Sequence, residues 1–385
     1  MFNFSFHNPT RIHFGSEKIA QIAREIPADA RVLVIYGGGS IKSNGVYEQV
    51  KTALGERHWF EFGGVESNPQ YDTLIQALDV IKAHNIDYLL AVGGGSVIDG
   101  SKFIAAASHY EGEDPWDIFT KHYRVKAALP LGVVLTLPAT GSESNTVSVV
   151  SRGQDKLSFA SSRVRPLFAV LDPAVGLSLS LRQVSNGVVD AFIHVIEQYL
   201  TYPVNAKVQD RFAEGLLLTL IEEGPKALDP KTCDDLDVRA NIMWSASLAL
   251  NGLIGVGVPQ DWTTHMIGHE ITAAYGVDHA RTLSIILPAV MKHQRQNKAA
   301  KLKQYAERVW QVVDGSDEEK IDAAIAKTEA FFKRMQVPVR LSEANIGADA
   351  VDNILAQLES HGMLKLGENQ TITLEKSREI LTLAI

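Results

Sequence analysis

The sequence is poor in the features that mark secreted, membrane-spanning and nucleic-acid-binding proteins. It contains one cysteine, Cys233, which cannot form an intrachain disulfide and so favours a reducing cytoplasm. The start of the chain has no basic segment followed by an apolar one, and no run of about eighteen apolar residues occurs, so we expect neither a secretory signal nor a membrane span. The formal charge of −8 argues against a nucleic-acid partner, which would require clustered lysine and arginine.

What is present suits a globular protein with more than one hydrophobic core. At 385 residues the chain exceeds the size at which a single core stops growing, so two domains are expected. Its composition, 45% hydrophobic and 21% charged, shows no deficit of apolar residues that would indicate disorder. We place the domain boundary between residues 184 and 185, where the sequence pattern changes.

Residues 1–184 alternate short apolar runs with helical patterns. Nearly continuous apolar strands separated by helices are typical of a parallel sheet covered on both faces. The sequence therefore predicts an α/β, Rossmann-like dinucleotide-binding domain. The expected strands are 31–36, 58–62, 88–92, 131–138 and 166–172, with a hairpin within 145–161.

Residues 185–385 contain few alternating β-branched runs and predict an all-α domain. Ser185 and Asn186, both common N-cap residues, precede a long pattern of helical period. Further helices are expected around 206–222, 237–253, 260–275, 283–296, 300–313, 317–335, 350–361 and 374–383.

Two glycine-rich loops follow predicted strands. The first contains Gly38, Gly39 and Ser40, and the second contains Gly94, Gly95 and Ser96. Glycine lets backbone N–H groups approach phosphate oxygens, and a helix that starts just beyond adds the positive end of its dipole. Neither loop matches the G-x-G-x-x-G or Walker pattern, and either alone could be a structural turn. Two such loops at neighbouring strand ends favour an elongated ligand along the edge of the sheet.

The first loop also bears on the choice between NAD and NADP. Enzymes that bind NAD usually place a carboxylate near the adenosine ribose, but no Asp or Glu occurs between Val32 and Tyr47. A carboxylate would repel a 2′-phosphate by about 4 kcal/mol at ~4 Å and an effective dielectric of about 20. Lys42 would attract it. Lys42 by itself could be an ordinary surface residue, but together with the missing acid it favours NADP.

A group of metal-ligand side chains lies in the second half. Asp190 and His194 are four residues apart, as are His265 and His269, so each pair shares a helix face. Gly276 interrupts the second helical pattern, and we expect His279 to enter from the following turn. An isolated pair of this kind is often a modest surface interaction, but apolar neighbours make a free charge costly here. Nitrogen and oxygen donors without cysteine suit Fe²⁺ or Zn²⁺, and the sequence does not decide between them.

Several motifs in combination resemble the iron-containing (group III) alcohol dehydrogenases. They are "GGGSVIDGSKFIAAA", "LTLPATGSESN", "VLDP", "NGVVDAFIHVIEQY" and "HMIGHEITAAYGVDHA", and the likeness covers essentially the whole chain. Within that family the chain looks most similar to the NADPH-dependent aldehyde reductases and butanol dehydrogenases. The resemblance implies a dehydroquinate synthase-like architecture with an α/β domain before an all-α domain, and a homodimer.

The resemblance also implies roles for individual residues. The metal ligands would be Asp190, His194, His265 and His279, whereas His269 matches a position near the substrate. Cofactor-binding positions would be Gly38, Gly39, Ser40, Lys42, Asn68, Gly94, Gly95, Ser96, Asp99, Thr136, Ser142 and Lys156.

Together these inferences predict metal-dependent reduction of short- to medium-chain aldehydes by NADPH. The ion would act as a Lewis acid, and His269 would relay a proton or only hold a neighbouring group by a hydrogen bond. A metal-dependent phosphoester hydrolase and a dehydroquinate synthase-like lyase are the alternatives. The second would need several basic residues around its substrate, and the cleft segments contain few.

Overall fold

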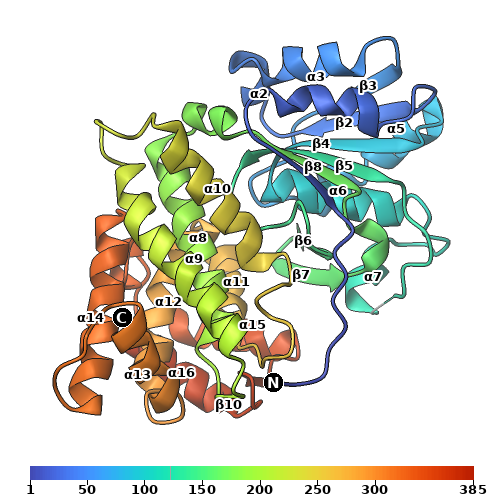
Figure 1. Ribbon diagram of the computed structural model, residues 1–385. Helices are drawn as coiled ribbons and strands as arrows, with labels where there is room; N and C mark the ends of the chain where they lie inside the picture. Colours follow the sequence, from blue (N-terminus) through green and yellow to red (C-terminus); the bar gives the residue numbers. More distant parts are fainter. Residues whose placement is uncertain (122) are drawn as a thin grey trace. The chain divides into compact units, whose positions relative to one another are not determined.

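In the computed structural model of the protein, a six-stranded sheet forms the centre of the first half of the chain (Figure 1). Its order is β1-β8-β5-β4-β2-β3, and each neighbouring pair is parallel. The five predicted strands and the antiparallel hairpin β6–β7 are confirmed. The sequence analysis missed β1, an edge strand with little apolar character. The strands are β1 (Arg11–Phe14), β2 (Arg31–Tyr36), β3 (His58–Phe62), β4 (Tyr88–Gly94), β5 (Leu131–Leu137), β6 (Val147–Arg152), β7 (Asp155–Ala160) and β8 (Phe168–Leu171).

Alternation along the strands gives the sheet two apolar faces. In β2, Leu33 and Ile35 belong to one buried cluster while Val32 and Val34 belong to another. Because successive side chains of a strand point to opposite faces, both faces must be covered by helices. The helices of this region are α1 (Ile22–Glu25), α2 (Ser40–Ser43), α3 (Val46–Leu54), α4 (Tyr71–Leu74), α5 (Ala77–His84), α6 (Gly95–Ala107) and α7 (Asp117–Thr120).

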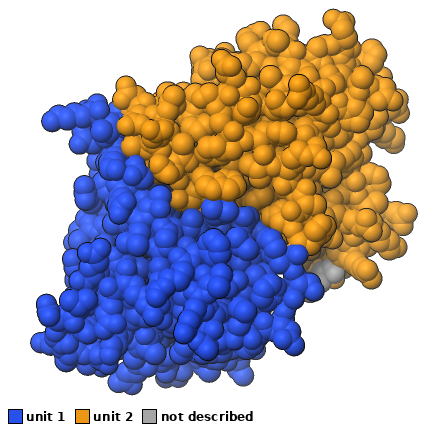
Figure 2. All heavy atoms as spheres, in the orientation of Figure 1, with its two compact units in different colours: residues 1–6, 180–233, 248–385 blue, residues 7–179, 234–247 orange. Residues whose placement is uncertain are grey.

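The structure describes residues 1–121 and 123–385, and these form two compact units. The sheet unit comprises residues 7–179 and 234–247, and the helical unit comprises residues 1–6, 180–233 and 248–385 (Figure 2). The boundary predicted at 184/185 lies within the first turns of α8 (Leu181–Tyr199).

The second half is predominantly helical, as predicted, with one short pair of strands. Its helices are α8, α9 (Lys207–Lys226), α10 (Leu236–Leu250), α11 (Thr263–Tyr275), α12 (His279–His293), α13 (Ala299–Arg308), α14 (Asp317–Arg334), α15 (Ala350–Ser360) and α16 (Leu374–Leu383), and the strands are β9 (Lys365–Leu366) and β10 (Ile372–Thr373). Among the described residues, no helix combines the length and the apolar character that a membrane crossing requires.

Two local predictions in this half are wrong. Helix α8 begins five residues before the proposed caps, because Ser180 accepts the Gln183 N–H and the Gln183 side chain accepts the Ser180 N–H. Ser185 and Asn186 therefore lie inside the helix. His279 does not stand in a turn but is the first residue of α12. Gly276 ends α11 with φ of 67°, a conformation that favours glycine.

Candidate active site

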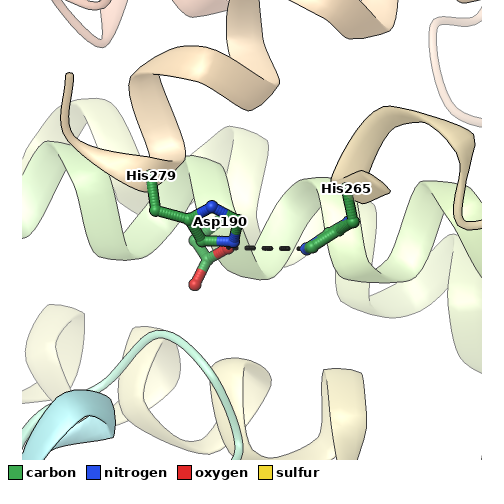
Figure 3. Close-up of side chains that lie close together, drawn as sticks. All are labelled: Asp190, His265 and His279. Carbon is green, nitrogen blue, oxygen red and sulfur yellow. Dashed lines mark ion pairs between the residues drawn. The ribbon is translucent and has the colours of Figure 1, made fainter. Parts of the chain in front are cut away.

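One face of α8 carries the acidic centre of the metal-ligand cluster. Asp190 and His194 are one turn apart and both are buried. His265 comes from the first turns of α11, and His279 opens α12 (Figure 3). Three helices that are separate in the sequence therefore bring together the four residues that the resemblance implies as ligands.

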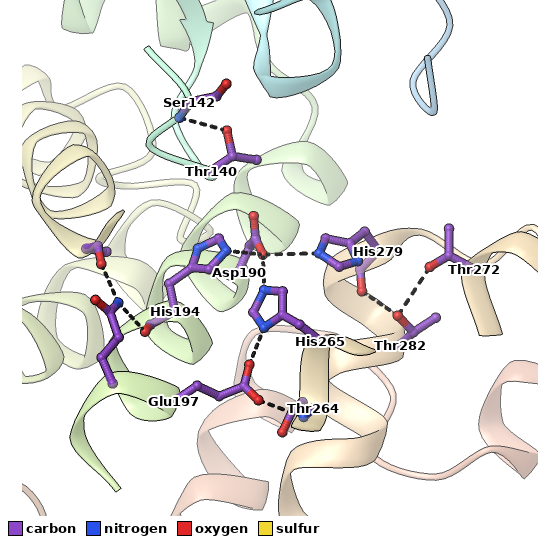
Figure 4. A network of polar contacts seen from close by, with 12 residues as sticks. Thr140, Ser142, Asp190, His194, Glu197, Thr264, His265, Thr272, His279 and Thr282 are labelled. Atoms are coloured by element: carbon purple, nitrogen blue, oxygen red, sulfur yellow. Dashed lines mark hydrogen bonds and ion pairs between the residues drawn. The ribbon is translucent and has the colours of Figure 1, made fainter. Parts of the chain in front are cut away.

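The spacing within this cluster fits a bound cation better than hydrogen bonds. The Nε2 atoms of His194, His265 and His279 lie 3.7, 3.9 and 3.9 Å from Asp190 Oδ1 (Figure 4). These distances are too long for hydrogen bonds. Within the described part of the chain, the buried Asp190 Oδ1 accepts no hydrogen bond. Two donor atoms that each lie about 2.0–2.2 Å from one tetrahedral ion are separated by roughly 3.3–3.6 Å, so a small contraction would complete the site.

His269 lies beside this cluster. Its side chain is buried, and its ring centre is 4.9 Å from that of His279 and 6.2 Å from that of His265. The group of donor atoms that lie within 4.8 Å of one another comprises Asp190, His265 and His279, and it includes neither His194 nor His269. His194 Nε2 nevertheless lies 3.7 Å from Asp190 Oδ1, whereas His269 contacts the cluster through the rings of His265 and His279. A role near the reacting groups therefore suits His269 better than a role as ligand.

Glu197 was not predicted from the sequence, and it contacts the nitrogen of the His265 ring that faces away from Asp190. Its Oε2 contacts His265 Nδ1, and its Oε1 accepts the Thr264 N–H at 2.6 Å. Burial and the nearby charge of Asp261 raise the pKa of Glu197 well above its usual value. A signal was available, because Glu197 follows His194 by three residues and so shares its helix face.

Asp278 is a second missed residue and anchors the start of α12. Its Oδ2 accepts hydrogen bonds from Arg182 Nε and Asn186 Nδ2, both at 2.7 Å. Arg182 and Asn186 belong to α8 and lie about two turns and one turn before Asp190, respectively. The helix that supplies two candidate ligands therefore also fixes the residue next to His279.

The first glycine loop leaves room for a ligand. It joins β2 to α2, and Gly39 has φ of 93°, which explains glycine at that position. Gly38 has no such backbone requirement, and a Cβ atom built there would meet nothing within 4 Å. The packing of this chain therefore does not require glycine at Gly38, and the space beside its backbone is open.

The second loop joins β4 to α6 and is tightly packed. A Cβ on Gly95 would lie 2.5 Å from Thr140 Oγ1, and one on Gly94 would lie 3.0 Å from Leu137 Cβ. The N-terminus of α6 is thereby held at the carboxyl end of β4, where a helix dipole favours an anion. Ser96 Oγ donates to the Ser67 carbonyl, in the loop that also carries Asn68. Thr136, near the end of β5, belongs to the same edge of the sheet.

Asp99 and Ser142 are linked inside the sheet unit. Ser142 Oγ donates to Asp99 Oδ1 at 2.5 Å, and the Val149 N–H donates to Asp99 Oδ2 at 3.1 Å. Burial raises the pKa of Asp99, and the positive charge of Lys102 opposes this rise, with a smaller contribution from Lys156 on β7. Asp99 therefore helps to hold the segment that carries Ser142.

Lys42 is paired with an acid that the sequence analysis did not consider. Its Nζ lies 2.8 Å from Glu61 Oε2 on the neighbouring strand β3, and Tyr36 and Tyr47 donate to the same carboxylate. The hydrogen bond to Glu61 raises the pKa of Lys42, so its ammonium stays charged. The missing acid in the loop is thus partly replaced by one from β3, nineteen residues further along the chain.

Family models and relatives agree with this arrangement. The model described as iron-containing alcohol dehydrogenase matches residues 9–173, and the C-terminal model of the Fe-containing alcohol dehydrogenase family matches residues 184–385. The chain belongs to the iron-containing alcohol dehydrogenases. The resemblance inferred from the motifs is therefore confirmed, and so is the predicted fold class.

Individual relatives within the family extend over nearly the same length. The NADPH-dependent aldehyde reductase YqhD of Escherichia coli is 57% identical over 384 residues, 99% of each chain. The crystal structure of E. coli K-12 YqhD covers 100% of this chain and 99% of its own, with a TM-score of 0.98 and 56% identity. A probable NADH-dependent butanol dehydrogenase 1 of Bacillus subtilis is 40% identical and covers 94% of this chain and 95% of its own. Membership of the family therefore does not decide between the two nicotinamide cofactors.

Proposed function

We propose that this chain reduces short- to medium-chain aldehydes to primary alcohols, reversibly, with NADPH and one divalent metal ion, Fe²⁺ or Zn²⁺. The observation that carries the proposal is the buried Asp190 Oδ1 surrounded by three imidazoles at 3.7–3.9 Å. The four ligands would be Asp190, His194, His265 and His279. The similarity to an NADPH-dependent aldehyde reductase over 99% of the chain supports the choice of reaction.

The preference for NADPH rests on the first glycine loop. The loop itself contains no acid, and the Lys42 ammonium counters the negative charge of the neighbouring Glu61 on β3. Gly38, Gly39 and Ser40 would approach the adenosine phosphate end. The pyrophosphate would bind at Gly94, Gly95 and Ser96, where α6 begins. Asn68, Thr136, Ser142 and Lys156 would line the remainder of the cofactor site.

The helical unit would hold and polarise the carbonyl compound. A bound divalent cation supplies Lewis acidity toward the carbonyl oxygen, and the nicotinamide supplies the hydride. Trp262 packs against the His265 ring at 5.3 Å between centres and shields that ligand from water. The product oxygen needs a proton, and His269, whose ring centre lies 4.9 Å from that of His279, would relay it.

The test is consumption of NADPH with a panel of straight-chain aldehydes. We expect turnover with the protein as purified, loss of turnover after chelation, and recovery when Fe²⁺ or Zn²⁺ is restored. The ion that restores the higher kcat identifies the metal. Turnover that survives complete removal of metal would contradict the proposal.

The two alternatives predict different outcomes. A phosphoester hydrolase would release phosphate without oxidising NADPH, and a dehydroquinate synthase-like lyase would leave its nicotinamide unchanged after each cycle. The family match favours neither alternative.

We further propose that the enzyme is a cytoplasmic homodimer. The single cysteine supports the compartment. Three exposed phenylalanines at alternate positions of the N-terminal segment, Phe2, Phe4 and Phe6, support a surface for a second copy. Light scattering would measure the mass in solution, and a monomer at micromolar concentration would contradict this assignment.

A further inference from the structure

Glu197 contacts one nitrogen of the His265 ring, while Asp190 faces the other. Glu197 Oε2 contacts His265 Nδ1, and His265 Nε2 lies 3.9 Å from Asp190 Oδ1. Both carboxylates come from α8, seven residues apart. When Nδ1 donates its hydrogen to Glu197, the neutral ring carries its lone pair on Nε2, on the side of the cluster.

Glu197 also holds the start of α11 in place. The Thr264 N–H donates to Glu197 Oε1 at 2.6 Å, and the Asp261 N–H donates to the Glu197 carbonyl at 2.8 Å. Asp261 is braced in turn by Lys298, whose buried Nζ lies 2.7 Å from Asp261 Oδ2. The Thr264 N–H therefore holds the Glu197 side chain, and Asp261 holds the Glu197 backbone. Neither residue belongs to the ligand cluster.

A second histidine–glutamate pair, between Glu270 of α11 and His361 at the end of α15, provides a comparison. His361 Nδ1 lies 2.8 Å from Glu270 Oε1, and both side chains are nearly inaccessible. His361 does not belong to the ligand cluster. What sets Glu197 apart is that its histidine also faces Asp190.

We propose that Glu197 is a positioning residue for the metal, which selects the His265 tautomer with Nε2 available as a ligand and so sets the affinity for the ion. The proposal rests on the proposed function of the four-residue cluster. It predicts that Glu197 affects metal binding more than it affects the stability of the metal-free protein.

The experiment measures Co²⁺ affinity of the metal-free full chain from the visible absorption of the bound ion, with a competing chelator. We expect Glu197→Gln to bind Co²⁺ about 10–100-fold more weakly than the unmodified chain, as other carboxylates behind metal-bound histidines do. Glutamine accepts the Nδ1 hydrogen only without a negative charge and can also turn its NH2 group toward the ring, so it selects the tautomer less well than glutamate. Glu197→Ala should bind Co²⁺ more weakly still, because alanine cannot accept that hydrogen at all. Glu270→Gln is the matched control and should keep the unmodified affinity.

Thermal unfolding of the metal-free variants separates positioning from folding. Glu197→Gln and Glu270→Gln should unfold at similar temperatures, although only the first loses affinity. Equal Co²⁺ affinity in Glu197→Gln and the unmodified chain would overturn the role of Glu197 while leaving the metal site intact, and so would equal losses in both glutamine variants. If Asp190→Asn retains full Co²⁺ affinity, the proposed cluster and the role of Glu197 both fail.

Discussion

Replacing Gly268 by alanine should loosen the contact that aligns the two histidine-bearing helices α11 and α12. A Cβ at Gly268 would lie 2.7 Å from Leu283 Cδ2 and 3.0 Å from Thr282 Oγ1. Both neighbours are completely buried, so neither can move into solvent. Overpacking of this kind costs about 1–3 kcal/mol, while alanine gains about 0.5–1 kcal/mol over glycine inside a helix. We therefore expect a net destabilisation of about 1–2 kcal/mol.

A double-mutant cycle isolates this contact. Leu283→Ala alone should cost about 2–5 kcal/mol through the cavity it leaves. In the double variant the methyl group at Gly268 occupies part of that space, so the total should fall below the sum of the single effects by about 1–2 kcal/mol. Urea unfolding of the metal-free chains, followed by circular dichroism, gives the three free energies of unfolding.

The Co²⁺ affinity of the same variants tests whether this contact also affects the metal site. Gly268 lies three residues after His265, so Gly268→Ala should weaken Co²⁺ binding and the double variant should recover part of it. Effects on unfolding that add within about 0.5 kcal/mol, or a stabilising Gly268→Ala, would show that the alanine is accommodated without displacing α12.

The remaining predictions concern the metal ligand, the proton relay and cofactor choice. His265→Ala should purify with less than about a tenth of the metal of the unmodified chain, measured by elemental analysis, and retained metal would contradict its assignment. His269→Ala should keep its metal but lower kcat about 100-fold or more, with a changed pH profile; full kcat across the pH range would leave this residue a structural role. Lys42→Ala should raise KM for NADPH more than KM for NADH, and a clear preference of the unmodified chain for NADH would refute the charge argument. Glu61→Gln should shift the cofactor preference further toward NADPH across the neutral pH range. About 0.5 M salt should reduce this shift. An equal change in KM for both cofactors would mean that Glu61 only supports the loop.

The order of strands and helices was predictable because burial on two faces leaves a plain pattern in the sequence. The continuous apolar runs of β2, β4 and β5 predicted a covered parallel sheet, and the structure has it. Strand β1 was missed because its ends are exposed and its sequence, "RIHF", lacks that pattern. The start of α8 was misplaced because Ser180, Ser185 and Asn186 are all plausible caps, and only the reciprocal bonds between Ser180 and Gln183 decide among them.

For the site, spacing along a helix predicted which neighbouring side chains share a face. Contacts between segments that are distant in the sequence could not be predicted. The pair Asp190 and His194 and the pair His265 and His269 followed from helical period. The partner of Lys42 could not be found in this way, because Glu61 reaches it only through the parallel pairing of β2 with β3. Glu197 could have been found, since an acidic residue within an apolar helix face requires a partner.

A row of polar side chains along α8 limits how the sequence of this enzyme can vary. Arg182, Asn186, Asp190, His194 and Glu197 follow one another at intervals of three or four residues, so a single added or deleted residue would turn the later members about 100° away from the earlier ones. A substitution, by contrast, leaves the helical spacing of the other residues unchanged. Substitutions within α8 could therefore alter the preference of the proposed site for one metal over another, whereas a residue inserted or deleted between Asp190 and Glu197 would turn the proposed ligands away from the carboxylate that supports His265.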